Sequence, residues 1–316
     1  MTEEQLNALG PALDDFLQPY LYCCGYTQTF GHLHTYCRGL LSELQRKSVE
    51  PIALASGTPV RTLQEFLRDH DWSFAQVRDR LQRHVAAKLS SLPDDGLGNV
   101  GVIDETASVK DGTKTPGVKR QWCGYLGKKE NCVVTVHLGV CRGRYKTLID
   151  NELFLPEDWA ADRDRCKAAG IPEDMKHRPK WKIALEELDR AKSNEVPLDW
   201  LTFDEEYGKA PGFVCGLDKR NLLFVGEVPK SLSCLAANRS GQRPEATVKG
   251  RRADEVVRQS PVFVDQAWQK VHLSRQTLDE QVWEVKAAQV WQVQDEQWRQ
   301  RTYWLIWARN VETGEE

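Results

Sequence analysis

The chain has 316 residues, of which 41% are hydrophobic and 28% charged, and this composition is typical of a soluble protein with one large or two ordinary domains. A formal net charge of −3 argues against a surface uniformly coated for DNA, although a local basic patch can still neutralise phosphates. No apolar stretch approaches the roughly 20 residues that span a bilayer, and the N-terminus lacks a signal-peptide pattern. We therefore expect a cytoplasmic protein with no membrane partner.

Residues 1–90 are predicted to be helical, because apolar residues recur every three or four positions. Within this region, residues 48–68 contain a short apolar stretch, a Ser-Gly turn and a second stretch with Thr58 as the expected N-cap and Pro59 as the first helical residue. A helix, a glycine-containing turn and a helix outline a helix-turn-helix. A plain helical hairpin that packs on the core fits the pattern equally well.

On the helix-turn-helix interpretation, the second helix enters a DNA major groove with its N-terminal end. The side chains expected to contact DNA there are Arg61, Thr62 and Gln64. The sequence of residues 91–98 is rich in Gly, Pro and Asp, which is typical of a linker and marks a domain boundary.

Beyond the linker the pattern changes to strands. Apolar, β-branched runs predict strands at 99–106, 132–140, 145–154, 200–204 and 221–228, with helices at 180–194 and 212–220. This order of elements predicts an α/β layer arrangement, and it matches the order of the ribonuclease-H-like fold.

Two carboxylates stand where apolar runs of this core end. Asp104 follows Val102-Ile103, and Asp204 follows Leu201-Thr202-Phe203 one hundred residues later. A carboxylate at a strand end is a natural ligand for a hard divalent cation, and two of them together can hold a pair of metals. The plainer interpretation is that each Asp caps its strand or starts a turn. Asp150 and Glu152 are further strand-end acids, for which a supporting role near the metals is the less favoured interpretation.

A Gly/Lys-rich loop is predicted to follow Asp104. It carries six basic residues beside the candidate metal site, where a polyanionic substrate needs its charge neutralised: Lys110, Lys114, Lys119, Arg120, Lys128 and Lys129. After Asp204, Gly208 is expected to permit a sharp exit from the strand. His137 falls within a predicted strand, and we expect a core position for it.

The last part of the chain, residues 230–316, changes character again. Residues 237–260 are polar and basic, which predicts a loop or an extended arm, whereas tryptophan-rich runs near 282–286 and 303–309 predict strands. We expect these tryptophans to be packed in the sheet. Trp291 and Trp298 have polar neighbours and are the better candidates for stacking on a base.

The chain has nine cysteines, and none of them forms a Cys-x-x-Cys pair or has a histidine at zinc-ligand spacing. We therefore expect free thiols, several of them in the core. Cys123 and Cys132 flank a predicted turn, but a metal site there is the less favoured interpretation.

Seven segments in this order resemble the DDE transposases of bacterial insertion sequences, most closely insertion-sequence family 701. They are RKSVEPIAL (46–54), TLQEFL (62–67), IDET (103–106), KTPGVKRQWCG (114–124), NCVVTVHLG (131–139), FLPEDW (154–159) and LTFDEEYG (201–208). The resemblance covers nearly the whole chain, and its specificity lies in the number and order of the segments.

The resemblance implies a helical DNA-binding region at 1–90, a ribonuclease-H-like catalytic core at 99–229 and a β-rich insertion at 230–316. It assigns Asp104 and Asp204 as catalytic and metal-binding acids that hold two Mg²⁺ or Mn²⁺ ions for DNA cleavage and strand transfer. The implied partners are double-stranded DNA, as element terminal repeats and as target, and a second copy of the chain in a homodimer. A nucleoid-associated protein of the bacterial cytoplasm is expected.

The family's third acid, a Glu on a helix after the insertion, has no counterpart before the last residue of the sequence. Glu312, Glu315 and Glu316 lie in a predicted polar turn and are not assigned to that role. We therefore expect a core that lacks its final helix, as in a C-terminally truncated transposase. Two alternatives remain open: a catalytically inactive product that only binds DNA, and a ribonuclease-H-like nuclease with no role in transposition.

Overall fold

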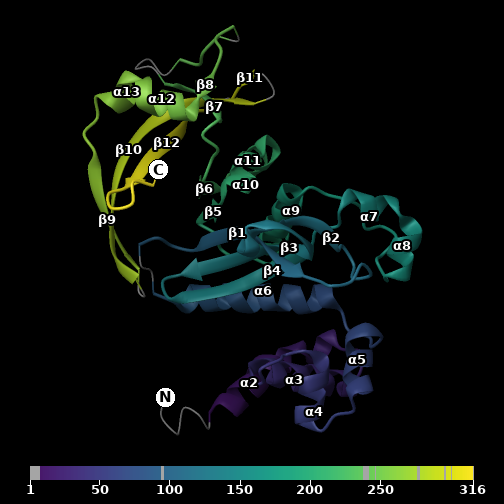
Figure 1. Cartoon of the computed structure of the whole chain (residues 1–316). Helices are drawn as coiled ribbons and strands as arrows, with labels where there is room; N and C mark the ends of the chain where they lie inside the picture. Colours follow the sequence, from purple (N-terminus) through teal and green to yellow (C-terminus); the bar gives the residue numbers. More distant parts are fainter. Residues whose placement is uncertain are drawn as a thin grey trace. The chain divides into compact units, whose positions relative to one another are not determined.

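A computed structural model describes residues 8–93, 96–237, 242–245, 247–275, 278–294, 297–299 and 301–315 (Figure 1). The chain forms two compact units, the first made of Met1–Pro179 and Ile183–Trp200 and the second of Lys180–Lys182 and Leu201–Glu316. Both units contain helices and strands, and the predicted mixed α/β class is confirmed. The finer division at residues 90, 99 and 229 stays a prediction.

Helices begin the first unit, as the spacing of apolar residues predicts. They are α2 (Leu9–Leu17), the 3-10 helix η1 (Gln18–Cys23), α3 (Thr27–Leu41), α4 (Val49–Ser56), α5 (Val60–Arg68) and α6 (Phe74–Ser91). Leu17, Tyr20 and Cys23 form one buried cluster, and Ile52, Ala53 and Leu63 form another. Residues 1–7 of the predicted region lie outside the described residues.

The turn between α4 and α5 follows the predicted pattern with a shift of one residue. Gly57 ends α4 in the left-handed conformation at φ 66°, where glycine avoids the steric cost of a side chain. Pro59 is the N-cap of α5, so the prediction that Thr58 caps this helix is wrong. The Thr58 hydroxyl instead accepts a hydrogen bond from Ser56 at 3.0 Å.

Helix α6 has a buried side and an exposed side. Ser73 caps its N-terminus by accepting a hydrogen bond from the backbone N–H of Gln76. Gln82, Val85 and Leu89 recur at helical spacing and are all buried, whereas Arg83 and His84 are exposed. The side with Gln82 contacts strand β4 (Tyr145–Leu153), because the Gln82 amide donates to the carbonyl of Ile149 at 3.2 Å.

An antiparallel sheet follows, centred on β3 (Lys128–Arg142). Strand β1 (Val100–Val109) pairs along one edge of β3, while β2 (Lys119–Cys123) and β4 pair along the other. Strand β2 and the short helices η2 (Gly124–Leu126), α7 (Glu157–Ala161) and α8 (Arg163–Ala168) are elements that the sequence analysis did not predict.

Alternation along β3 gives this sheet a buried side and a polar side. Cys132, Val134, Val136, Leu138 and Val140 are all buried, and Val133, Thr135 and His137 between them are half-buried. Helix α9 (Lys180–Ser193) lies on the buried side, because its Arg190 pairs with Asp150, the cross-strand partner of Leu138. The predicted helix at 180–194 is confirmed.

Strand β5 (Trp200–Phe203) begins at the last residue of the first unit, and the second unit continues with α10 (Glu205–Gly208), α11 (Pro211–Lys219) and β6 (Leu223–Gly226). The predicted strand, helix and strand in this interval are confirmed, with boundaries within two residues. Phe203 packs edge-to-face on Phe213 with ring centroids 5.0 Å apart. This aromatic contact fixes the end of β5 against α11.

The rest of the second unit is a sheet around the long strand β10 (Leu278–Gln294). Its other strands are β7 (Ser233–Ala236), β8 (Arg251–Arg252), β9 (Gln269–Arg275), β11 (Gln297–Trp298) and β12 (Tyr303–Asn310). Val256, Val257 and Phe263, from helices α12 (Ala253–Gln259) and α13 (Pro261–Val264), form a core with Val290 and Leu305 of the sheet.

The prediction that 237–260 is a loop or an arm is wrong for its last third. Val256 and Val257 lie in adjacent positions of α12 and are both buried, which a run of only two apolar residues did not reveal in the sequence. Through the whole part of the chain that the structure describes, no helix combines the length and apolarity that a membrane span requires.

Candidate functional site

Asp104 lies in the middle of β1, so the prediction of a strand-end position is wrong for this residue. The strand continues because Thr106, Ala107 and Ser108 keep pairing with β3, a register that ends only at Val109. The Asp104 side chain is exposed, and its Oδ1 accepts a hydrogen bond from the backbone N–H of Glu105 at 2.7 Å.

The polar side of the first sheet surrounds Asp104. Cross-strand partners share a side, and Asp104 pairs with His137, which in turn pairs with Asn151. Thr106 and Thr135 form the next pair on the same side. Asp104 therefore stands in a row of polar side chains drawn from three strands.

His137 is half-buried on this polar side, so the expected core position is wrong. Its Nε2 lies 2.8 Å from the Thr135 hydroxyl. Burial lowers the pKa of the imidazole and the Asp104 carboxylate opposes that effect. The alternation of β3 assigns His137 to this side once the register with β1 is known.

The second half of the basic segment after Asp104 forms a β-hairpin and not a loop. Lys110 and Lys114 lie in the connection between β1 and β2, but Lys119 and Arg120 belong to β2, and Lys128 and Lys129 belong to β3. The prediction of one continuous loop from 110 to 129 is therefore wrong. The four basic residues of β2 and β3 divide between the two sides of the hairpin.

The register of β2 with β3 determines which of these residues lie on the polar side of the sheet. Arg120 pairs with Asn131 and Trp122 pairs with Lys129, and these positions share the side of Asp104. Arg120 and Lys129 are exposed, and Trp122 is 58% exposed. An acid, two cations and an aromatic ring thus face solvent on one side of one sheet.

Lys119 and Lys128 point to the opposite side and have acidic neighbours. Lys119 pairs with Asp158 at 2.9 Å, and Lys128 pairs with Glu130 at 3.2 Å. Arg120 and Lys129 are therefore the better candidates for binding a polyanion.

Asp204 directly follows β5, as predicted, and it also caps a helix. Its Oδ1 accepts a hydrogen bond from the backbone N–H of Glu206 at 3.0 Å at the start of α10, and the side chain is exposed. Gly208 closes α10 at a point where an added Cβ would lie 1.8 Å from the carbonyl oxygen of Glu227. Close approach of two backbone segments, and not a sharp exit from the strand, therefore requires glycine there.

The beginnings of β1 and β5 are tied together within the first unit. The carbonyl of Asn99 accepts hydrogen bonds from the backbone N–H groups of Asp199 at 2.8 Å and Trp200 at 3.3 Å. The Asp199 carboxylate in return accepts from the N–H of Asn99 at 2.7 Å. Asp104 belongs to the first unit and Asp204 to the second, and their joint role stays a prediction.

The candidate DNA-binding residues of α5 lie at its N-terminal end. Arg61 and Gln64 are exposed and Thr62 is half-buried, while Leu63 and Phe66 face the core. Arg61 forms an i,i+4 ion pair with Glu65 at 2.7 Å. The helix thus presents polar side chains on the side away from its packing surface.

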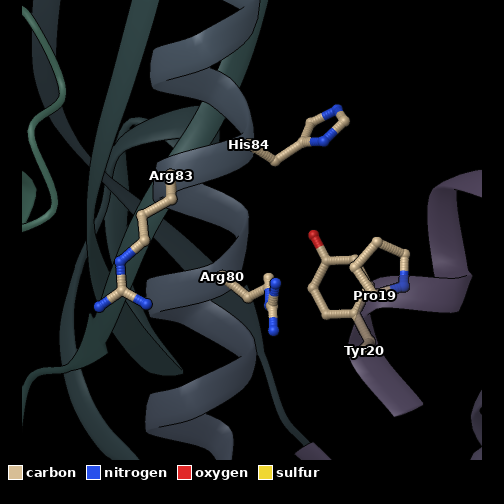
Figure 2. A pocket seen from close by; sticks show the side chains of 5 residues that line it. All are labelled: Pro19, Tyr20, Arg80, Arg83 and His84. Carbon is tan, nitrogen blue, oxygen red and sulfur yellow. The ribbon is translucent and has the colours of Figure 1, made fainter. Parts of the chain in front are cut away.

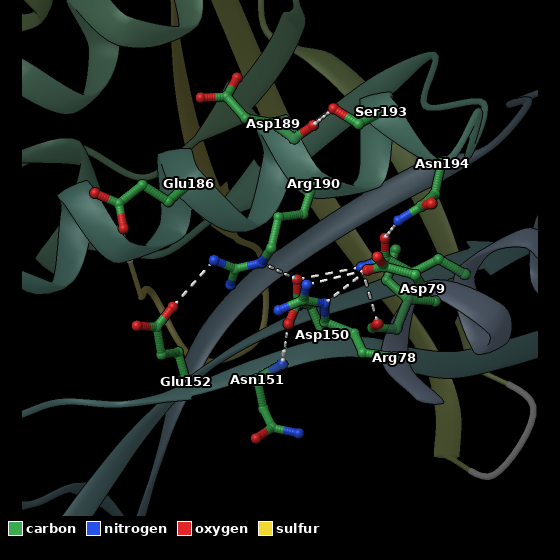
Figure 3. A network of polar contacts seen from close by, with 12 residues as sticks. Arg78, Asp79, Asp150, Asn151, Glu152, Glu186, Asp189, Arg190, Ser193 and Asn194 are labelled. Atoms are coloured by element: carbon green, nitrogen blue, oxygen red, sulfur yellow. Dashed lines mark hydrogen bonds and ion pairs between the residues drawn. The ribbon is translucent and has the colours of Figure 1, made fainter. Parts of the chain in front are cut away.

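Asp150 and Glu152 lie on the buried side of the sheet, opposite Asp104, and take part in an ionic network (Figure 3). Arg190 Nε donates to Asp150 at 2.7 Å, and its Nη1 pairs with Glu152 at 3.1 Å. Arg178 joins Glu152 to Glu186. Both acids therefore stabilise the packing of α9, and the supporting role beside Asp104 is wrong.

Comparison with known proteins identifies the family. The family model described as DDE superfamily endonuclease matches residues 20–303. This chain belongs to that family. It is also similar, at 30% identity over 201 residues, to a protein named as a probable transposase for insertion sequence element IS701 from Microchaete diplosiphon. That similarity covers 63% of this chain and 48% of the relative, so the chain spans about half the length of the relative.

Both candidate acids of this member of the DDE superfamily suit a hard divalent cation. Asp104 and Asp204 both offer exposed carboxylate oxygens, and Mg²⁺ is usually bound by one or two carboxylates together with water and substrate phosphates. Within the described ranges, no group of three or more His, Cys, Asp or Glu is arranged as metal ligands. The nine cysteines are free, and Cys123 and Cys132 are buried in one small cluster.

The tryptophans of the second unit are mostly packed. Trp268 and Trp307 meet at 4.7 Å in a T-shaped contact, and Trp291 is only 6% exposed, so its selection as a base-stacking candidate is wrong. The side chain of Trp298 lies outside the described residues. Trp304 is 66% exposed, although its apolar neighbours in the sequence had favoured a packed position.

Proposed function

We propose that this chain is part of an insertion-sequence transposase that binds double-stranded DNA at the ends of its element and cleaves it with divalent metal ions. The observation that carries the proposal is the shared side of Asp104, Arg120, Trp122 and Lys129 on the first sheet. Cations and an aromatic ring beside a carboxylate suit a nucleic-acid substrate. Family membership and the name of the similar transposase support the same conclusion.

In this proposal Asp104 and Asp204 are the acids that bind Mg²⁺ or Mn²⁺. The chemistry that two such ions supply when bound is activation of a water or hydroxyl nucleophile and stabilisation of the leaving oxygen. The hydrogen bond from Glu206 to Asp204 orients that carboxylate. Family membership supports the pairing of these two acids.

Other features of the proposal concern fold and partners. Apart from the extra strand β2, the antiparallel strands β1, β3 and β4 followed by α9 and β5 have the order expected of a ribonuclease-H-like core. The exposed Arg61 and Gln64 of α5 support a role for the helical region in recognising element ends. Strand transfer into target DNA, action as a homodimer and a place at the nucleoid belong to the same proposal.

Cleavage of DNA that carries the element's terminal repeats tests the catalytic part. The wild-type chain with Mg²⁺ or Mn²⁺ should cut at the repeat ends, and Asp104→Asn and Asp204→Asn should each reduce the rate at least about 100-fold, because each removes a charged ligand. Asp111→Asn changes an exposed acid of the β1–β2 connection and should leave the rate unchanged.

Two outcomes would contradict the catalytic assignment. Cleavage that persists in both Asp104→Asn and Asp204→Asn would remove these acids from the reaction. Tight DNA binding by the wild-type chain without cleavage under either metal would favour a protein that only binds DNA. For that function, a gel shift weakened by Arg61→Ala and Gln64→Ala would support the role of α5.

A further inference from the structure

A small pocket lies in the first unit between η1 and α6, away from the polar side of the sheet. It has a volume of about 220 Å³ and is lined by Pro19, Tyr20, Arg80, Arg83 and His84 (Figure 2). Pockets that enclose drug-sized ligands are larger, at about 300–1,000 Å³. The space therefore suits a single small group.

Helical spacing places the two arginines and the histidine of the pocket on one side of α6. Arg80, Arg83 and His84 occupy positions i, i+3 and i+4 of α6, on the side opposite Gln82 and Val85. Phe16 of α2 contacts the His84 ring edge-on at 5.2 Å and packs on Tyr20 at 5.7 Å. The aromatic contacts fix the orientation of two of the lining side chains.

Tyr20 supplies a buried donor without a partner. The residue is 4% exposed, and its hydroxyl makes no hydrogen bond to the described residues. Figure 2 shows this hydroxyl directed toward the space between Arg80 and His84. Burial raises the pKa of Tyr20 to about 12, so the phenol keeps its proton and can donate it.

Arg80 supplies a half-buried positive charge without a counterion. None of the ion pairs or hydrogen bonds among the described residues involves it, whereas Arg78 on the same helix pairs with Asp79 at 3.0 Å. The groups that act on the Tyr20 phenol are Arg80 and the thiols Cys23 and Cys37, with no carboxylate among them. A half-buried guanidinium without a counterion, beside a buried phenol donor, provides a site for an anion from outside the chain.

We propose that the pocket between η1 and α6 binds one phosphate group of a DNA backbone. Arginine matches a phosphate with two parallel N–H donors, and the Tyr20 hydroxyl adds a third donor. Arg83 and His84 are exposed and also line the pocket, whereas the guanidinium of Arg83 is directed away from Tyr20 (Figure 2). The inference rests on the proposed function for its choice of DNA, because free phosphate has the same chemistry.

Binding of a labelled DNA duplex over a series of salt concentrations tests the inference. Arg80→Gln should weaken binding about 10-fold and reduce the slope of log affinity against log salt by about 1, as expected for one lost phosphate contact. Tyr20→Phe should weaken binding about 3-fold without lowering the thermal midpoint, because its hydroxyl has no partner to lose. Arg144→Gln, an exposed cation of the β3–β4 turn, is the control and should change neither the affinity nor the slope.

A second arm separates the sources of phosphate. Inorganic phosphate should raise the thermal midpoint of the wild-type chain above that in chloride of equal ionic strength, and Arg80→Gln should abolish the difference. If phosphate stabilises the protein while both variants bind DNA like the wild type, the DNA assignment is overturned. If neither ligand distinguishes the variants, the site itself is overturned.

These readouts are independent of cleavage. A chain that binds DNA through Arg80 and Tyr20 but does not cut it leaves this inference standing and removes the catalytic proposal. If the chain cuts DNA through Asp104 but binds it equally well after both pocket substitutions, the catalytic proposal stands and this inference is removed.

Discussion

Glu187 is an acidic residue at a position of α9 whose neighbours on the same side of the helix are apolar. It occupies a buried position of α9 in register with Ala184, Leu188 and Ala191, and neither of its carboxylate oxygens has a hydrogen-bond partner among the described residues. Burial and, second, the nearby Asp150 raise the pKa of this carboxyl to about 8. The spacing of the apolar residues around it was visible in the sequence, and it would have assigned this acid to the buried side of the helix.

The raised pKa predicts a pH-dependent stability. A carboxyl with a folded-state pKa near 8 holds its proton between about pH 4.5 and 8, where the unfolded chain has released it, so the free energy of unfolding should fall as pH rises through this window. Glu187→Gln removes that titration. The variant should therefore gain stability relative to the wild type between pH 5 and pH 8, by about 1–4 kcal/mol in urea melts.

Glu173→Gln provides the matched control, because Glu173 is exposed in the loop before α9. Its stability should stay parallel to that of the wild type at every pH. A stability difference between Glu187→Gln and wild type that is the same at pH 5 and pH 8 would exclude a protonated Glu187 in the folded chain.

At the scale of elements, the hairpin of β2 and β3 explains why a charged segment was predicted as a loop. Strand β2 consists of Lys119, Arg120, Gln121, Trp122 and Cys123, which shows little of the alternation that identifies a half-buried strand. Charged side chains are common on edge strands, where they discourage pairing with another chain. Pairing with β3 forms the strand, and that pairing is not encoded in the local sequence.

The hairpin predicts a charge effect that depends on the side of the sheet. The double substitution Arg120→Gln and Lys129→Gln removes two cations from the polar side and should reduce the salt slope of DNA binding by about 2. Lys128→Gln removes a cation that pairs with Glu130 on the opposite side and should change the slope little. Equal effects of Lys128→Gln and Lys129→Gln in the same titration would argue against DNA binding on the polar side.

At the scale of the whole molecule, the sequence predicted the order of helices and strands far better than the contacts between them. Helix α9, β5, α11 and β6 were predicted close to their observed positions because each has a strong local pattern. The extent of β1, and with it the place of Asp104, was not predictable, since it depends on the register with β3. Residues far apart in the chain supply the missing information.

Gln82 is one such long-range link. Its amide donates to Ile149 and to Asp150, each at 3.2 Å, and its carbonyl accepts from Asn194 at 2.8 Å in a fully buried position. Gln82→Ala removes all three hydrogen bonds and should lower the free energy of unfolding by about 2–4 kcal/mol. Gln76→Ala, at an exposed site of the same helix, should cost less than about 0.5 kcal/mol in the same denaturant series. A similar loss in the two variants would show that the buried contacts contribute little.

The two sides of helix α6 also limit how residues 1–90 could be exchanged. One side of it, with Gln82, Val85 and Leu89, serves the sheet, and the other side, with Arg80 and His84, faces the pocket of the helical region. A hybrid protein that exchanged residues 1–90 for the corresponding region of another protein would therefore carry a foreign helix onto this sheet. Such an exchange requires a graft along the outer side of the helix, with its inner side retained, because the boundary between these two parts follows the length of α6.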